Sequence, residues 1–152
     1  MRIAIGSDHR GVTSRRRIIG CLERLGHEVV DCGSHSEDAV DYPDIAGDVA
    51  NQVSDGSADR GILLCSTGVG MAIAANKLPS IRAATCNDEV TAEMSRRHND
   101  LNVLCIAAEM IGSEEQEKII RTWLDTSFEG GRHARRVAKI TALEPCDENA
   151  KK

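Results

Sequence analysis

Five short apolar runs, each separated from the next by a segment with helical spacing, constrain the fold of this chain most strongly. The runs cover residues 2–7, 28–32, 61–64, 81–85 and 102–107. Strands that are joined by helices rather than by tight hairpins pair in parallel, and their sheet is covered on both faces. We therefore predict an α/β fold: a single-domain, Rossmann-like three-layer sandwich with a five-stranded parallel sheet.

The intervening segments carry signals for the ends of helices. Gly26 suits a C-terminal cap, and Pro43 suits a first turn. Asp88 and Ser113 are typical N-caps, the latter in a Ser-x-x-Gln pattern. The predicted helices cover residues 13–25, 42–53, 71–76, 88–97, 113–123 and a last segment from 132.

Composition excludes several classes of function. The 152 residues suit one domain, which we place at residues 1–144, followed by a polar tail at 145–152. Aromatic residues are only 2% of the chain and the net charge is −5, so we expect no nucleic-acid partner. No apolar run approaches the roughly 20 residues that a membrane helix needs, so we expect no membrane partner.

The cysteines point to a reducing compartment. The six have neither a Cys-x-x-Cys pair nor the spacing of a zinc finger, so we expect free thiols and no metal site. The first residues are too few and too soon charged for a signal peptide. We therefore expect a cytoplasmic protein.

Residues 61–71 have the pattern of a buried strand, a loop of small residues and the start of a helix. Such a junction aims backbone N–H groups and the positive end of a helix dipole at one place, so it predicts an anion site. The motif is neither a P-loop nor a dinucleotide fingerprint, which leaves a small phosphate or an oxyanion. Cys65 stands at its edge, where the same field favours a thiolate, although it could also be a buried structural thiol.

Three further groups could take part in chemistry. Asp8 and His9 follow the first strand, although Asp8 could equally cap a helix. His98 follows two arginines, as a catalytic residue or as a solvated histidine at a helix end. Arg132 and Arg136 share a helix face that could bind phosphate or simply face solvent.

Seven motifs occur in order over nearly the whole chain. They are Gly6-Ser-Asp8-His9-Arg-Gly11, Asp41-Tyr42-Pro43, Cys65-Ser-Thr67-Gly-Val-Gly70, Ile73-Ala-Ala-Asn76-Lys77, Ile81-Arg82-Ala83, Ser95-Arg-Arg-His98-Asn99-Asp100-x-Asn102-Val103-Leu104 and Glu129-Gly-Gly-Arg132-His-x-x-Arg136. Together they resemble the sugar-phosphate isomerase family that includes ribose-5-phosphate isomerase B and galactose-6-phosphate isomerase.

The resemblance implies an aldose–ketose isomerase, without cofactor or metal, that interconverts ribose 5-phosphate and ribulose 5-phosphate through an enediolate. It implies that Cys65 is the base, that Thr67 assists, and that His98 opens the sugar ring together with Asp8. It implies a homodimer or tetramer with the site at the subunit interface and the arginines supplied by the neighbouring subunit. The substrate-binding residues it implies are His9, Ser66, Gly68, Val69, Gly70, Asn99, Arg132 and Arg136.

Two positions depart from the family's pattern. Ser66 stands where members usually have Gly, and Glu109 stands where many have a phosphate-binding Arg. Glu109 would repel phosphate unless it is paired, and Arg10 is a candidate replacement cation. A galactose-, allose- or tetrose-phosphate substrate therefore stays open. So do two different classes of protein, a non-catalytic sugar-phosphate binding protein and a cysteine hydrolase.

Overall fold

The computed structural model describes residues 1–35 and 38–145. Five parallel strands form one sheet in the order β2-β1-β3-β5-β4. The strands are β1 (Arg2–Ser7), β2 (Glu28–Asp31), β3 (Arg60–Cys65), β4 (Ala83–Thr85) and β5 (Val103–Ala107). The predicted fold class is confirmed. β1 and β3, at the centre of this order, carry the site described below.

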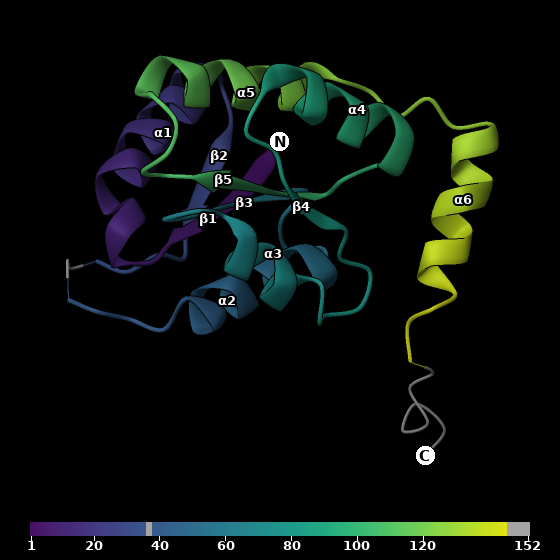
Figure 1. Ribbon diagram of the computed structural model, residues 1–152, viewed down its shortest axis with the longest axis horizontal. Coiled ribbons are helices and arrows are strands. Elements are labelled where there is room, and N and C mark those ends of the chain that lie inside the picture. The colour runs from purple at the N-terminus through teal and green to yellow at the C-terminus, as the bar shows by residue number, and fades with distance from the viewer. Residues whose placement is uncertain (36–37, 146–152) are drawn as a thin grey trace.

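Helices cover both faces of the sheet (Figure 1). On one face α1 (Val12–Arg24), α4 (Glu89–Asn99) and α5 (Ser113–Asp125) pack against strand residues such as Ile62 and Leu104. On the other face α2 (Tyr42–Ser54) and α3 (Val69–Ala75) pack against neighbours such as Leu63. The alternation arises because successive strand residues point to opposite faces, and both faces are buried.

A sixth helix, α6 (Arg132–Thr141), stands beside this sandwich (Figure 1). It packs against α4, and His133 is its one buried residue. Most of its other side chains are exposed, including Ile140 at 44%. α6 therefore buries little of its own surface against the rest of the described chain.

Several local predictions can be checked at the ends of elements. The Asp88 side chain accepts the Thr91 N–H at 2.7 Å and caps α4, as predicted. The Ser113 cap is wrong: Gly112 is the N-cap and makes no side-chain cap bond, while the carbonyl of Ser113 accepts from Arg17. β4 begins two residues later than predicted, at Ala83, because residues 81–82 do not join the ladder. Of the predicted tail at 145–152, all but the first residue lie outside the described residues.

The described cysteines are free thiols. Cys21, Cys65, Cys86 and Cys105 are buried and Cys32 is half-buried, whereas Cys146 lies outside the described residues. None of the helices in the described part of the chain is long and apolar enough to cross a bilayer.

Candidate active site

The loops that follow β1, β3 and β5 lie next to one another, at the carboxyl ends of these three strands. Cys65 pairs with Ala107 at the end of the β3–β5 ladder, and the Asp8 N–H donates to the Leu64 carbonyl at 3.3 Å. Open parallel sheets bind ligands at this edge, because loops from neighbouring strands converge there.

Cys65 ends β3 with its side chain turned into the fold and only 6% of the residue exposed. The Gly68 N–H donates to Cys65 Sγ at 3.1 Å. Gly68 has a φ of 79°, and a Cβ there would lie 3.0 Å from the Thr85 side chain. The loop therefore presents a backbone dipole to the sulfur in a conformation that favours glycine.

Thr67 is held in the same way by the same loop. Its Oγ1 accepts the Val69 N–H at 3.3 Å. The N–H groups of Gly68 and Val69, two residues that the resemblance assigned to substrate binding, thus face the side chains of Cys65 and Thr67. A substrate oxygen bound here would share these donors with them.

Tyr42 is a site residue to which the sequence alone assigned no role. It is the first residue of α2, and a Cβ built on Gly70 would lie 2.7 Å from its ring and 3.1 Å from its hydroxyl oxygen. The phenol therefore lies over the loop that carries Cys65. Its place in the motif Asp41-Tyr42-Pro43, as the one tyrosine of the chain, is the signal that could have found it.

Asp8 and His9 lie at the short 3₁₀ turn η1 (His9–Gly11) that follows β1. Asp8 is buried, and its Oδ1 accepts the Arg10 N–H at 3.0 Å, which confirms the capping role. His9 Nδ1 accepts the Val40 N–H at 3.4 Å. A neutral imidazole that accepts at Nδ1 carries its proton on Nε2, so His9 can donate from that nitrogen.

The two residues that depart from the family's pattern contact each other. Ser66 Oγ donates to Glu109 Oε2 at 2.5 Å, and Arg10 Nη1 donates to Glu109 Oε1 at 2.8 Å. The hydrogen bonds from Ser66 and then Arg10 lower the pKa of Glu109, so its carboxylate is charged at neutral pH. Glu109 is therefore paired rather than isolated beside the anion loop.

A second group of predicted residues lies near the amino end of β5, opposite the end of the sheet that carries Cys65. His98 and Asn99 end α4, just before β5 begins at Val103, whereas Cys65 pairs with the last residue of β5. At about 3.3 Å per residue, the length of β5 separates the two groups by roughly 15 Å. Within one chain His98 is therefore not brought next to Asp8, its expected partner in ring opening.

This second group is organised around Glu129. The rings of His98 and His133 stack with centroids 4.2 Å apart and planes 2° apart. Glu129 Oε2 lies 4.0 Å from His98 Nε2 and 3.5 Å from His133 Nε2. Arg97 forms an ion pair with Glu129, and Arg132 Nε donates to His133 Nε2 at 3.4 Å. Arg136 is exposed, one helical turn after Arg132.

His98, Glu129 and His133 are also the residues, within the described ranges, that could supply three ligands to a metal. Metal–nitrogen bonds of about 2.0–2.1 Å lie in the plane of each imidazole. Two rings only 2° from parallel direct their nitrogen lone pairs side by side rather than at one point. The observed arrangement is therefore a stacked histidine pair beside a carboxylate, and it does not fit a zinc site.

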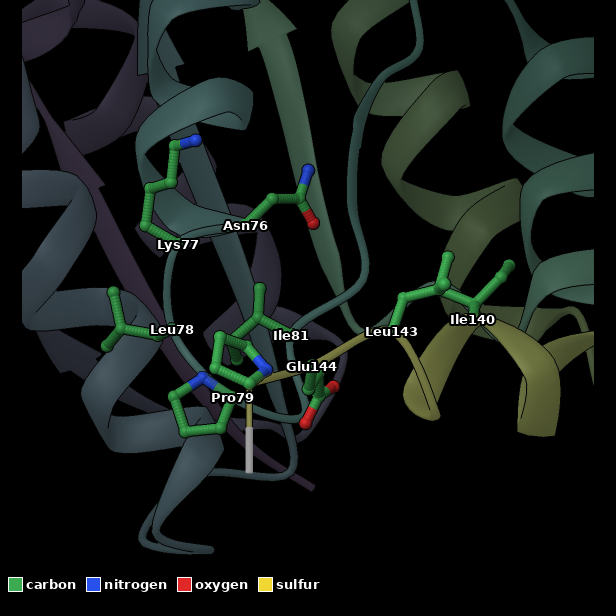
Figure 2. Close-up of a pocket in the computed structure, with 9 residues that line it drawn as sticks. Asn76, Lys77, Leu78, Pro79, Ile81, Ile140, Leu143 and Glu144 are labelled. Carbon is green, nitrogen blue, oxygen red and sulfur yellow. The ribbon is translucent and has the colours of Figure 1, made fainter. Parts of the chain in front are cut away.

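A hollow of about 540 Å³ lies away from both groups (Figure 2). It separates the segment that follows α3 from the end of α6, and Ile140 and Leu143 face Leu78 and Ile81 across it. Its lining is mostly apolar. None of the predicted catalytic or substrate-binding residues lines it.

Comparisons with known proteins agree on one family. The model of the Ribose/Galactose Isomerase family matches residues 3–140. Ribose-5-phosphate isomerase B of Escherichia coli (strain K12) is 46% identical over 143 residues, which cover 94% of this chain and 96% of that protein.

Solved structures are similar over the same length. Ribose-5-phosphate isomerase B of Clostridium thermocellum has a TM-score of 0.93 at 48% identity, covering 94% of this chain and 97% of that one. The Mycoplasma genitalium enzyme with bound ribulose-5-phosphate has a TM-score of 0.90 at 42% identity, covering 93% and 94%. The chain therefore belongs to the Ribose/Galactose Isomerase family.

Proposed function

We propose that this chain is an aldose–ketose isomerase that interconverts ribose 5-phosphate and ribulose 5-phosphate. The observation that carries the proposal is Cys65, at the end of β3, with the Gly68 N–H on its sulfur and Thr67 two residues away. Relatives of nearly the same length bear the name ribose-5-phosphate isomerase B, and one of their structures holds ribulose-5-phosphate. Both observations support a sugar-phosphate substrate.

In the proposed reaction, Cys65 moves one proton between neighbouring carbons. Its thiolate removes the proton from C2 of the open-chain aldose, and the C1 carbonyl becomes an enediolate oxygen. The same proton is then delivered to C1, while a proton passes from the C2 hydroxyl to the C1 oxygen. No net oxidation occurs, so the chemistry asks only for a base and for donors that stabilise the enediolate.

We infer that a second copy of the chain completes the site. Four of the residues expected to act on the sugar and its phosphate, His98, Asn99, Arg132 and Arg136, lie at the far end of the sheet, out of reach of Cys65 in the same chain. The helix that follows the Cys65 loop exposes Val69 at 52% and Ile73 at 60%, one turn apart. A copy docked on that face would bury them and could bring its own His98, Asn99, Arg132 and Arg136 to the loop. The proposed assembly is a homodimer, or a tetramer built from two such dimers.

A different phosphosugar is the second candidate, favoured by one observation. Ser66 and Glu109 stand together at the rim of the loop, where both depart from the family's pattern. A galactose-, allose- or tetrose-phosphate would differ from ribose 5-phosphate in length and hydroxyl positions, which this rim could sense. A cysteine hydrolase is less well supported, because it requires a Cys–His pair with an orienting group, no hydrolase motif accompanies Cys65 and His98 in the sequence, and the matching family is one of isomerases.

An aldose–ketose assay with a panel of four-, five- and six-carbon phosphosugars tests the proposal. Ribose 5-phosphate should have the highest kcat/KM. Cys65→Ala should lower kcat by about 10²–10⁴-fold, because the base is lost. Cys32→Ala is the matched control: it removes a half-buried thiol that follows β2, two strands away from β3 in the sheet, and should leave kcat unchanged. Full activity in Cys65→Ala would show that the base is misassigned.

Treatment with a metal chelator tests the cofactor-free mechanism separately. Dialysis of the purified protein against EDTA should leave kcat and KM for ribose 5-phosphate unchanged, because the proposed steps are proton transfers between protein groups and sugar. Loss of activity that returns when a divalent metal is added would contradict this mechanism.

A further inference from the structure

Arg10, Ser66 and Glu109 form a cluster at the rim of the candidate site, called here the Glu109 cluster. One Glu109 oxygen accepts from Arg10 Nη1 at 2.8 Å and the other accepts from Ser66 Oγ at 2.5 Å. The three residues follow β1, β3 and β5 respectively. One carboxylate therefore ties together three loops that are far apart in the sequence.

Each contact has a consequence for the anion loop. The hydroxyl of Ser66 is directed to Glu109, outside the loop, rather than towards Cys65. The charge of Glu109 is balanced by Arg10, so it is no longer an isolated negative charge beside a phosphate site. The hydrogen bonds from Arg10 and Ser66 thus reduce the repulsion that the Glu109 carboxylate would exert on a bound phosphosugar.

Arg10 keeps most of its hydrogen-bonding capacity. Its side chain is 55% exposed, and among residues 1–35 and 38–145 its guanidinium hydrogen-bonds to Glu109 alone. A guanidinium carries five N–H donors in a fixed plane, which suits bidentate contact with phosphate oxygens. The hydrogen bond to Glu109 holds Arg10 Nη1 in place and leaves the remaining guanidinium N–H groups unused by the other described residues. His9, the preceding residue, can offer a further N–H donor from Nε2.

We propose that Arg10 binds the substrate's phosphate in this chain and that Glu109 is a positioning residue that orients the Arg10 guanidinium. The proposal rests on the proposed function in that the substrate is a phosphosugar. It assigns the role of the family's missing arginine to a residue from another loop. Among the residues that the structure describes, Asp8 is the other carboxylate whose charge acts on this cation, and its side chain accepts the Arg10 backbone N–H.

A rival explanation uses the same contacts: Arg10 only neutralises Glu109 and never touches phosphate. Both explanations predict that Arg10→Ala weakens phosphate binding, because an unpaired carboxylate is left behind. The double variant Arg10→Ala/Glu109→Ala separates them. Neutralisation alone predicts full recovery, since cation and carboxylate leave together, whereas a phosphate contact predicts only partial recovery.

Binding of inorganic phosphate, measured by calorimetry on the full chain, is the test. Arg10→Ala should weaken it by about tenfold or more, as expected for a charge-assisted hydrogen bond. The double variant should regain part of this and remain about threefold or more weaker than the wild type. Arg10→Lys should retain more affinity than Arg10→Ala. The matched control is Arg24→Ala, an exposed arginine at the far end of α1, which should bind as the wild type does.

Full recovery in the double variant, an unchanged Arg10→Ala, or no binding to the wild type would overturn the proposal. Kinetics with ribose 5-phosphate add a second readout: KM should rise more than kcat falls, because Arg10 is remote from the reacting carbons. Absence of turnover in the wild type would instead contradict the proposed function, and the phosphate titrations would still decide the role of Arg10. Melting temperatures of all variants should match the wild type, since the altered side chains are exposed.

Discussion

At the scale of single residues, the hydrogen bond to the sulfur of Cys65 depends on the backbone conformation of one glycine. Gly68 places its N–H 3.1 Å from Sγ by adopting a φ of 79°, in the left-handed region. Its Cα also lies so close to the end of β4 that an added Cβ would be 3.0 Å from Thr85 Cγ2 and 3.2 Å from the Ile106 carbonyl carbon. The residue at this position must therefore adopt a left-handed conformation, lack a side chain, and donate its N–H to the proposed base.

Gly68→Ala should accordingly lower both stability and activity. The left-handed conformation costs a residue with a Cβ about 1–2 kcal/mol, and crowding against Thr85 adds to this. Gly56→Ala is the matched control, because Gly56 has a φ of 80° but its Cβ would meet no atom within 4 Å. Denaturant unfolding should show a loss in both variants that is larger for Gly68→Ala. Only Gly68→Ala should lower kcat; equal kcat in the two would show that the N–H contact to Sγ is unimportant.

At the scale of elements, α6 is fastened to α4 mainly through one histidine. His133 is 5% exposed and stacks on His98, the tenth residue of α4. Burial, followed by the nearby charges of His98 and Arg132, lowers the pKa of His133, while Glu129 acts in the opposite direction. The packing of α6 therefore favours a neutral ring.

Acid should weaken this packing. A folded-state pKa below the ordinary value of about 6.5 means that the unfolded chain binds the proton first. The stabilisation is thus complete above pH 6.5 and is lost as pH falls towards the folded-state pKa. Thermal melts should show a lower Tm at pH 5.5 than at pH 7.5, and the difference should be smaller in His133→Gln.

His27 supplies an independent comparison, because burial and then the charge of the N-terminus lower its pKa as well. It lies between α1 and β2, away from α6, so His27→Gln should also reduce the pH dependence and the two effects should add. An unchanged pH dependence in His133→Gln would show that α6 is not held by the neutral ring.

Elements were predictable from the sequence wherever the signal was local. Asp88 caps α4 through a bond to the Thr91 backbone, three residues away, and the αL glycine Gly26 ends α1 as predicted. The Ser113 cap failed because Ser113 is already the first residue of α5, so the N-cap is Gly112, which has no side chain to cap the helix. The site depended on contacts between distant residues. Arg10 and Glu109 are 99 positions apart in the sequence. The close approach of the Tyr42 ring to Gly70 likewise joins two separate segments of the chain. Neither contact leaves a periodic pattern in the sequence.

At the scale of the whole molecule, the sheet itself separates the two halves of the candidate site. Loops at the carboxyl ends of the strands hold Cys65, Thr67 and Asp8, whereas the end of α4 holds His98 and the start of α6 holds Arg132. No rotation of side chains can close a gap set by the length of a strand. If all these residues act on one substrate, two chains must contribute to each site.

Mixing two inactive variants tests this arrangement directly. Cys65→Ala and His98→Gln should each be inactive, because each damages every site of a homodimer. In an equimolar mixture that exchanges subunits, each heterodimer has one site with both changes and one with neither. Activity should recover to about a quarter of the wild-type value, because half of the dimers are mixed and half of their sites are intact.

The matched control mixes Cys65→Ala with Thr67→Ala, whose altered residues belong to the same half of the site. Every site in such a heterodimer carries one change or the other, so no activity should return. Recovery in the first mixture and not in the second places Cys65 and His98 of each site on different chains. No recovery in the first mixture, once exchange is verified by mass spectrometry, would mean that one chain supplies the whole site. The helix α6 and the end of α4 would then have to move from their observed positions.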